Sequence, residues 1–133
     1  PACEEAPARH ILIVEDNRDG RESLAQLLKM LGHRVDTAED GPAGVEAALS
    51  LRPEAALIDI GLPKLDGHAV AVRLRAELGA GVLLIALTGH SQPEDRQRAL
   101  EAGFDAHLAK PVEVDELQRL LAGKARGRGG QRC

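Results

Sequence analysis

The stretch His10-Ile-Leu-Ile-Val14, followed directly by Glu15 and Asp16, decides the fold class of this chain. A short, continuous aliphatic run that ends in charge is typical of a strand buried on both faces, as in a parallel sheet covered by helices. Two similar runs and two weaker ones predict four further strands. These lie at residues 34–38, 55–58, 82–87 and 106–109.

Helical patterns separate the predicted strands. The first helix has one apolar stripe, because Leu24, Leu27, Leu28 and Leu31 fall at i, i+3, i+4 and i+7. A capping box formed by Asp19 and Glu22 predicts the start of this helix, and Gly32 predicts its end. Apolar residues at helical spacing predict three more helices, centred on residues 45–49, 70–78 and 114–121. A further helix is predicted by a capping box of Ser91 with Glu94, with Pro93 in the first turn and Gly103 at the far end.

A strand followed by a helix, repeated five times, predicts a parallel sheet with helices on both faces, since crossover connections are right-handed. The expected fold class is α/β, a flavodoxin-like doubly wound five-stranded sheet with strand order 2-1-3-4-5. We expect the domain to span residues 9–122. A Pro/Ala/Glu linker would precede it at 1–8, and a flexible basic Gly/Arg tail would follow it at 123–133.

Composition excludes several classes of function. The 133 residues, 44% hydrophobic and 29% charged, suit one globular domain. One Phe and no Trp or Tyr argue against a function that depends on stacking with bases. The net charge is −4, and without the four basic residues of the tail the balance becomes −8, which argues against direct nucleic-acid binding. No apolar run reaches the length of a membrane span, and the two cysteines, at the chain ends, fit a reduced cytoplasmic setting.

Four predicted strands are followed directly by polar residues able to carry chemistry. Glu15 and Asp16 follow the first strand, Asp59 the third, Thr88 the fourth and Lys110 the fifth. Because parallel strands end at one edge of the sheet, these side chains should gather there. Three neighbouring carboxylates repel one another unless a cation compensates, and an all-oxygen ligand set suits Mg²⁺.

Each of these residues, taken alone, is usually a helix cap or a turn residue. Together they form a cradle for a transferring phosphoryl group, with Lys110 as a point charge and Thr88 as a hydroxyl donor. A carboxylate would then be the nucleophile, a role that aspartate fills in forming aspartyl phosphates.

The chain resembles the receiver domains of two-component response regulators. The motifs that carry the resemblance are Ile11-Leu-Ile-Val-Glu-Asp-Asn17, Leu57-Ile-Asp-Ile-Gly-Leu-Pro63 with Asp66-Gly67, Ala86-Leu-Thr-Gly89, and Gly103 through Lys110-Pro111. The resemblance implies a phosphoacceptor signalling domain rather than an enzyme. Its partner would be a histidine kinase or a histidine phosphotransfer domain, its cofactor Mg²⁺ or Mn²⁺, and Asp59 would accept the phosphoryl group from a phosphohistidine.

The resemblance also assigns roles to the other site residues. Glu15 and Asp16 would hold the metal together with Asp59 and the backbone carbonyl of Gly61, with Asp16 a more direct ligand than Glu15. The hydroxyl of Thr88 would move to meet the phosphoryl group. Lys110 would contact it, and the bond between Lys110 and Pro111 would be cis.

One position departs from the family pattern. Where the family usually has Tyr or Phe as a switch residue, three residues before the lysine, this chain has His107. A histidine can rotate in the same way, but it is smaller and polar; it is either an ordinary strand histidine or a titratable switch. The resemblance also implies that Gly61 and His90 occupy positions that tune dephosphorylation in the family. The helix predicted between Ser91 and Gly103 has few apolar residues, so we expect it, the strand at 106–109 and the last helix to form the face that reads out phosphorylation.

Alternative functions remain at this point. A haloacid-dehalogenase-like phosphatase also uses an aspartate nucleophile, but it needs a second acid where this chain has Gly61. A pseudo-receiver binding module usually lacks the acceptor, the acidic pair or the lysine, all present here. The chain could be a stand-alone regulator or the carboxy-terminal receiver of a hybrid sensor kinase, in either case cytoplasmic, without direct membrane contact, and a monomer or weak dimer. The other histidines, His10, His33 and His68, show no ligand spacing and are expected at the surface or at strand edges.

Overall fold

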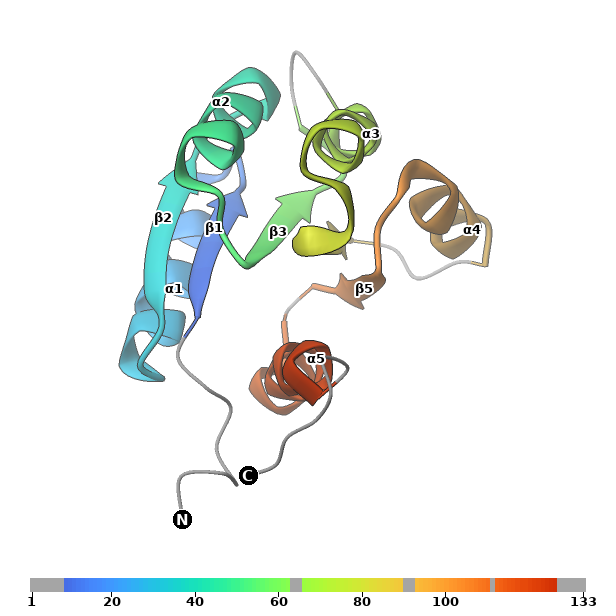
Figure 1. The fold of residues 1–133 in the computed structure, drawn as a ribbon. Coiled ribbons are helices and arrows are strands. Elements are labelled where there is room, and N and C mark those ends of the chain that lie inside the picture. Colours follow the sequence, from blue (N-terminus) through green and yellow to red (C-terminus); the bar gives the residue numbers. More distant parts are fainter. Residues whose placement is uncertain (1–8, 63–65, 90–92, 111, 127–133) are drawn as a thin grey trace.

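The structure is a computed structural model that describes residues 9–62, 66–89, 93–110 and 112–126. Its centre is one parallel sheet of five strands in the order β2-β1-β3-β4-β5 (Figure 1). The strands are β1 (His10–Val14), β2 (Arg34–Ala38), β3 (Ala55–Asp59), β4 (Leu83–Thr88) and β5 (Ala106–Ala109). The predicted fold class and strand order are therefore confirmed.

A helix follows each strand. The helices are α1 (Arg18–Met30), α2 (Gly41–Leu51), α3 (Gly67–Leu78), α4 (Pro93–Ala102) and α5 (Val114–Arg126), with a short 3-10 turn, η2 (Gly79–Gly81), after α3. Helices α1 and α5 cover one face of the sheet, and α2, α3 and α4 cover the other. None of the helices within the described ranges is long and apolar enough to cross a lipid bilayer.

Alternating side chains of the strands form two hydrophobic cores, one on each face. On β1, Leu12 and Val14 pack toward α2 and α3, whereas Ile11 and Ile13 pack toward α1 and α5. All four side chains are fully buried. This double burial explains why the strand has no polar alternation in the sequence.

The start of α1 differs from the prediction. Asn17, not Asp19, is the N-cap residue, and its side-chain oxygen accepts a hydrogen bond of 2.8 Å from the Gly20 N–H. Glu22 pairs with Arg18 at 3.1 Å instead of closing a capping box. Asn17 is the cap because it directly precedes the first helical residue and adopts the extended backbone that a cap requires.

His33 and the end of α5 also bear on the predictions. His33, expected at the surface or at a strand edge, directly precedes the edge strand β2 but is buried: its Nδ1 accepts a hydrogen bond from the Arg9 N–H, and its Nε2 lies 3.2 Å from Gln118 Oε1. Helix α5 continues to Arg126, so the first four residues of the stretch predicted as a flexible tail are helical. The rest of that tail, 127–133, and the linker 1–8 lie outside the described residues.

The strand register brings the site residues to one edge. Val14 pairs with Ile58 across β1 and β3, and Thr88 pairs with Ala109 across β4 and β5. The residues that follow these positions leave the sheet at the same level. Backbone hydrogen bonds therefore fix the relative heights of the strand ends before any side chain acts.

Candidate functional site

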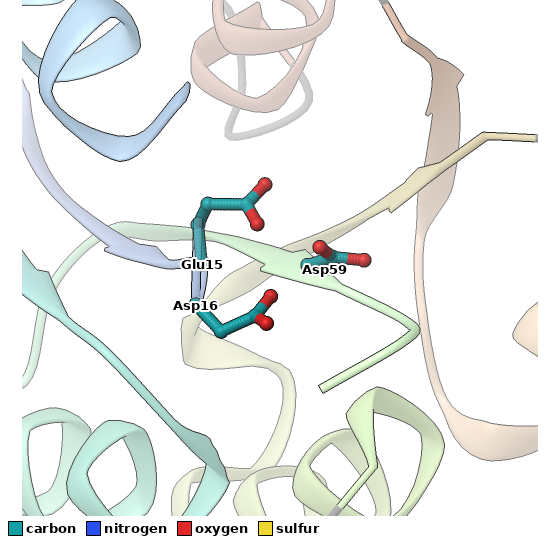
Figure 2. Close-up of side chains that lie close together, drawn as sticks. All are labelled: Glu15, Asp16 and Asp59. Carbon is teal, nitrogen blue, oxygen red and sulfur yellow. The ribbon is translucent and has the colours of Figure 1, made fainter. Parts of the chain in front are cut away.

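An acidic cluster lies at the carboxyl ends of β1 and β3. Figure 2 shows the carboxylates of Glu15 and Asp16 turned toward that of Asp59. One oxygen from each of the three lies within 4.8 Å of the others. Glu15 is 4% exposed, Asp59 is half-buried and Asp16 is exposed, so the cluster runs from the protein interior to its surface.

Lys110, just after β5, bridges two of these acids. Its Nζ donates to Glu15 Oε1 at 2.7 Å and to Asp59 Oδ2 at 2.9 Å. The two acceptor side chains are only 5% and 13% exposed, whereas that of Lys110 is 36% exposed. One ammonium thus compensates two carboxylates whose negative charges would be costly to bury without a partner.

The two buried acids titrate in opposite directions. Burial, and then hydrogen bonding with Asp59, raise the pKa of Glu15 above its ordinary value. Burial acts in the same direction on Asp59, but hydrogen bonds with Glu15, Lys110 and the Gly61 N–H outweigh it and lower the pKa of Asp59. Asp59 is therefore the acid held as an anion, the form that a carboxylate nucleophile needs.

The same contacts act on Lys110. Burial opposes its charge, but the hydrogen bonds to Glu15 and Asp59 prevail and raise the pKa of the ammonium. Lys110 therefore keeps its charge at neutral pH.

The loop after β3 contacts the Asp59 carboxylate through a backbone N–H. The Gly61 N–H donates to Asp59 Oδ1 at 2.9 Å. Gly67 begins α3 where no side chain fits, because a Cβ there would lie 2.5 Å from the Asp59 carbonyl oxygen and 2.6 Å from the Ile60 Cα. Asp66 caps α3 by accepting from the Ala69 N–H at 2.9 Å. The Asp66-Gly67 pair thus lets the helix approach Asp59 closely.

Thr88 and His107 lie on neighbouring strands beyond the acids. Thr88 is buried at the end of β4, and its carbonyl accepts from the Lys110 N–H at 2.8 Å. His107 is partly buried on β5, and among the described residues its Nε2 is a buried atom without a hydrogen-bond partner. It borders a cavity of about 280 Å³ lined also by Leu100 of α4 and Glu116 of α5.

Two predicted features fall on undescribed positions. Pro111, and with it the predicted cis bond after Lys110, lies outside the described residues, as does His90. The residues predicted to form the metal and phosphoryl site, from Glu15 to Lys110, do gather at one edge of the sheet.

The donor set fits a small, hard cation. All three side chains of the cluster offer carboxylate oxygens, and Mg²⁺ prefers oxygen ligands and retains several waters. The exposure of Asp16 leaves room for such waters. In Glu15, by contrast, Oε1 accepts from Lys110 and Oε2 accepts from the Asn17 N–H at 3.1 Å. Asp16 is accordingly better placed than Glu15 to ligate a metal directly.

Sequence reasoning missed Arg21. This residue of α1 is partly buried, and its Nη1 donates to the Glu15 carbonyl at 2.9 Å. A positive charge near the N-terminus of a helix interacts unfavourably with the helix dipole, and this was the only signal in the sequence that Arg21 has another role.

Comparisons with known proteins agree with this geometry. The family described as "Response regulator receiver domain" matches residues 11–122. The transcriptional regulatory protein PrrA of Mycobacterium tuberculosis is 38% identical over 119 residues, which cover 90% of this chain and 51% of that protein. The sensor histidine kinase RcsC of Salmonella typhi is 35% identical over 112 residues, which cover 84% of this chain and 12% of the kinase.

A solved structure of similar size also matches. The receiver domain of the sensor histidine kinase PA1611 from Pseudomonas aeruginosa, solved with magnesium coordinated in its active-site cleft, is 40% identical with a TM-score of 0.78. The alignment covers 86% of this chain and 95% of that one. The curated relatives are longer, and the chain spans about half of the regulator and about an eighth of the kinase. With the family match extending over most of its length, the chain belongs to the response regulator receiver domains.

Proposed function

We propose that this receiver domain accepts a phosphoryl group on Asp59 from a phosphohistidine of a histidine kinase or a histidine phosphotransfer domain. The observation that carries the proposal is the pairing of Asp59 with Lys110 at 2.9 Å inside a cluster of three carboxylates. An ionised carboxylate, a fixed cation and an oxygen-lined metal site are the parts that phosphoryl transfer to aspartate requires.

In the proposed reaction a carboxylate oxygen of Asp59 forms a bond to phosphorus. The phosphorus–nitrogen bond breaks, and its electron pair returns to the imidazole of the donor, which leaves neutral after taking up a proton. Lys110 stabilises the charge on the phosphoryl oxygens, and Thr88 donates its hydroxyl to them. Asp16, Asp59 and the Gly61 carbonyl, next to Glu15, would hold Mg²⁺ or Mn²⁺, which supplies further positive charge when bound.

The surroundings leave access for a donor protein. A cavity of about 410 Å³ opens beside Lys110, and its lining includes the apolar side chains of Leu24 and Leu27 of α1. A partner carrying a phosphohistidine could dock here against α1. The position of Gly61 argues against a phosphatase of the haloacid-dehalogenase type, because no acid stands there to protonate a leaving group.

The signal would leave through α4, β5 and α5. Phosphorylation adds charge that Thr88 and Lys110 contact only in the phosphorylated state, and such differential contacts shift a population between two conformations. On α4, Leu100 is 58% exposed whereas Ala99 is buried, so the described part of this helix has few apolar contacts that would resist movement. His107 of β5 belongs to this surface and borders a cavity that Leu100 of α4 and Glu116 of α5 also line.

The test is phosphate incorporation from acetyl phosphate in the presence of Mg²⁺, read by intact-protein mass spectrometry. We expect one acid-labile phosphoryl group on the wild-type chain and none on Asp59→Asn or after chelation of the metal. Asp66→Asn is the matched control, since asparagine also caps a helix and the position is exposed. Undiminished labelling of Asp59→Asn would show that the acceptor is another residue.

A further inference from the structure

Arg21 links α1 to the backbone that carries two of the site's acids. Its Nη1 donates to the carbonyl oxygen of Glu15 at 2.9 Å, at the point where the chain leaves β1. Guanidinium groups form strong, well-directed hydrogen bonds to oxygen acceptors. Arg21 is also partly buried, so the contact is shielded from competition by water.

With this bond, each polar group of Glu15 has a partner. Its N–H donates to the Ala38 carbonyl at 3.1 Å, and its carbonyl accepts from Arg21. Its carboxylate oxygens accept from Asn17 and Lys110. The Glu15 residue is thus held on the β2 side, the α1 side and the β5 side at once.

Asp16 is the next residue, and its side chain is exposed. The direction in which its carboxylate points therefore depends on the peptide unit between Glu15 and Asp16, whose carbonyl is the group that Arg21 holds. We propose that Arg21 is a positioning residue for the metal site: by fixing the Glu15 carbonyl, it presents the Asp16 carboxylate toward Asp59. This inference rests on the proposed function, in which the cluster binds a divalent cation.

Charge and positioning predict opposite results when Arg21 is removed. Deleting a positive charge near a cation site should tighten metal binding through simple electrostatics. Deleting a bond that orients a ligand should weaken it, and the loss of such supporting contacts typically reduces metal affinity 10- to 100-fold. The sign of the change therefore separates the two effects.

Arg18 provides a matched control. It lies in the same first turn of α1 and carries the same charge, but its side chain is 78% exposed and pairs with Glu22 on its own helix. Arg18→Met removes one positive charge from this helix end without touching the Glu15 carbonyl.

The experiment measures the dissociation constant of Mn²⁺ from the fall in the electron paramagnetic resonance signal of free Mn²⁺, with folding checked by circular dichroism. We expect Arg21→Met to raise the constant about tenfold, Arg21→Lys to recover part of the loss, and Arg18→Met to leave it unchanged or lower it. If Arg21→Met is unfolded, Arg21→Gln takes its place with the same expectation.

Unchanged or tighter binding in the folded Arg21 variant overturns the inference, as does equal weakening in Arg18→Met. Either result, with Mn²⁺ bound by the wild-type chain, leaves the proposed function intact. Failure of the wild-type chain to bind Mn²⁺ overturns both.

Discussion

Replacing Lys110 by methionine should destabilise the domain chiefly through the two acids that it leaves behind. Methionine keeps the apolar stem but loses the bonds to Glu15 at 2.7 Å and to Asp59 at 2.9 Å. Hydrogen bonds to charged groups contribute about 1.5–3 kcal/mol each. Because the Lys110 side chain is 36% exposed, solvent screening reduces their sum, and we expect a loss of about 2 kcal/mol in the free energy of unfolding.

The same substitution should cost far less when the acids are neutral. In an Glu15→Gln/Asp59→Asn background the two amides do not repel each other, so Lys110→Met should cost about 0.5 kcal/mol, as at an ordinary surface site. The difference, about 1.5 kcal/mol, is the coupling between the lysine and the acid pair. Added Mg²⁺ should also reduce the cost of Lys110→Met while both acids are present.

Urea unfolding followed by far-ultraviolet circular dichroism measures these costs, since the chain has no Trp or Tyr for fluorescence. Measurements at pH 7 with a chelator define the metal-free values. An equal cost of Lys110→Met in both backgrounds would refute the reasoning, because it would mean that the cost does not depend on the charges of Glu15 and Asp59.

Three further predictions concern the same site. Gly67→Ala should lower the free energy of unfolding by about 1–3 kcal/mol, because the new Cβ would overlap backbone beside Asp59, whereas Gly20→Ala should not destabilise, since only the Asn17 side chain lies near; urea unfolding of both variants decides this. The pKa of Lys110 is raised in the folded state, so its stabilising contribution is complete at pH values below 10.5, the ordinary lysine pKa, and is lost as the pH rises through the folded-state pKa. The difference in the free energy of unfolding between wild type and Lys110→Met should therefore shrink at alkaline pH. A difference that stays constant with pH would contradict this prediction. Beryllofluoride, a phosphoryl mimic, should change amide exchange in α4 and β5 more than in α2. Equal protection of α4 and β5 with and without beryllofluoride would contradict the proposal that they form the readout face.

The buried strands and the strand-end residues could be predicted because their signals are local. An aliphatic run such as His10–Val14 has few other ways to hide its side chains, and β1, β2 and β5 begin and end where expected. Parallel topology then brings Glu15 near Lys110, 95 residues later, without knowledge of any side-chain contact. The strand order alone is enough to bring these two residues together.

Contacts of long polar side chains could not be predicted in the same way. Arg75 donates to the carbonyls of Gly79, Val82 and Gly103 and pairs with Asp105 at 2.8 Å, yet its sequence neighbours give no sign of these partners. A flexible side chain finds its acceptor only after the fold has placed it. The burial of His33 and the role of Arg21 escaped prediction for this reason.

Glu15 and Asp59 follow or end internal strands of the sheet, whereas Lys110 follows an edge strand. Glu15 and Asp59 extend from β1 and β3, which have a hydrogen-bonded neighbour on each side, whereas Lys110 follows β5, a four-residue strand at the outer border with β4 alone beside it. A partner that binds at the β5 edge could shift the ammonium of Lys110 while Glu15 and Asp59 keep their spacing. Changes at the β5 edge alone can therefore alter how related chains respond to partners, while the spacing of Glu15 and Asp59 is preserved.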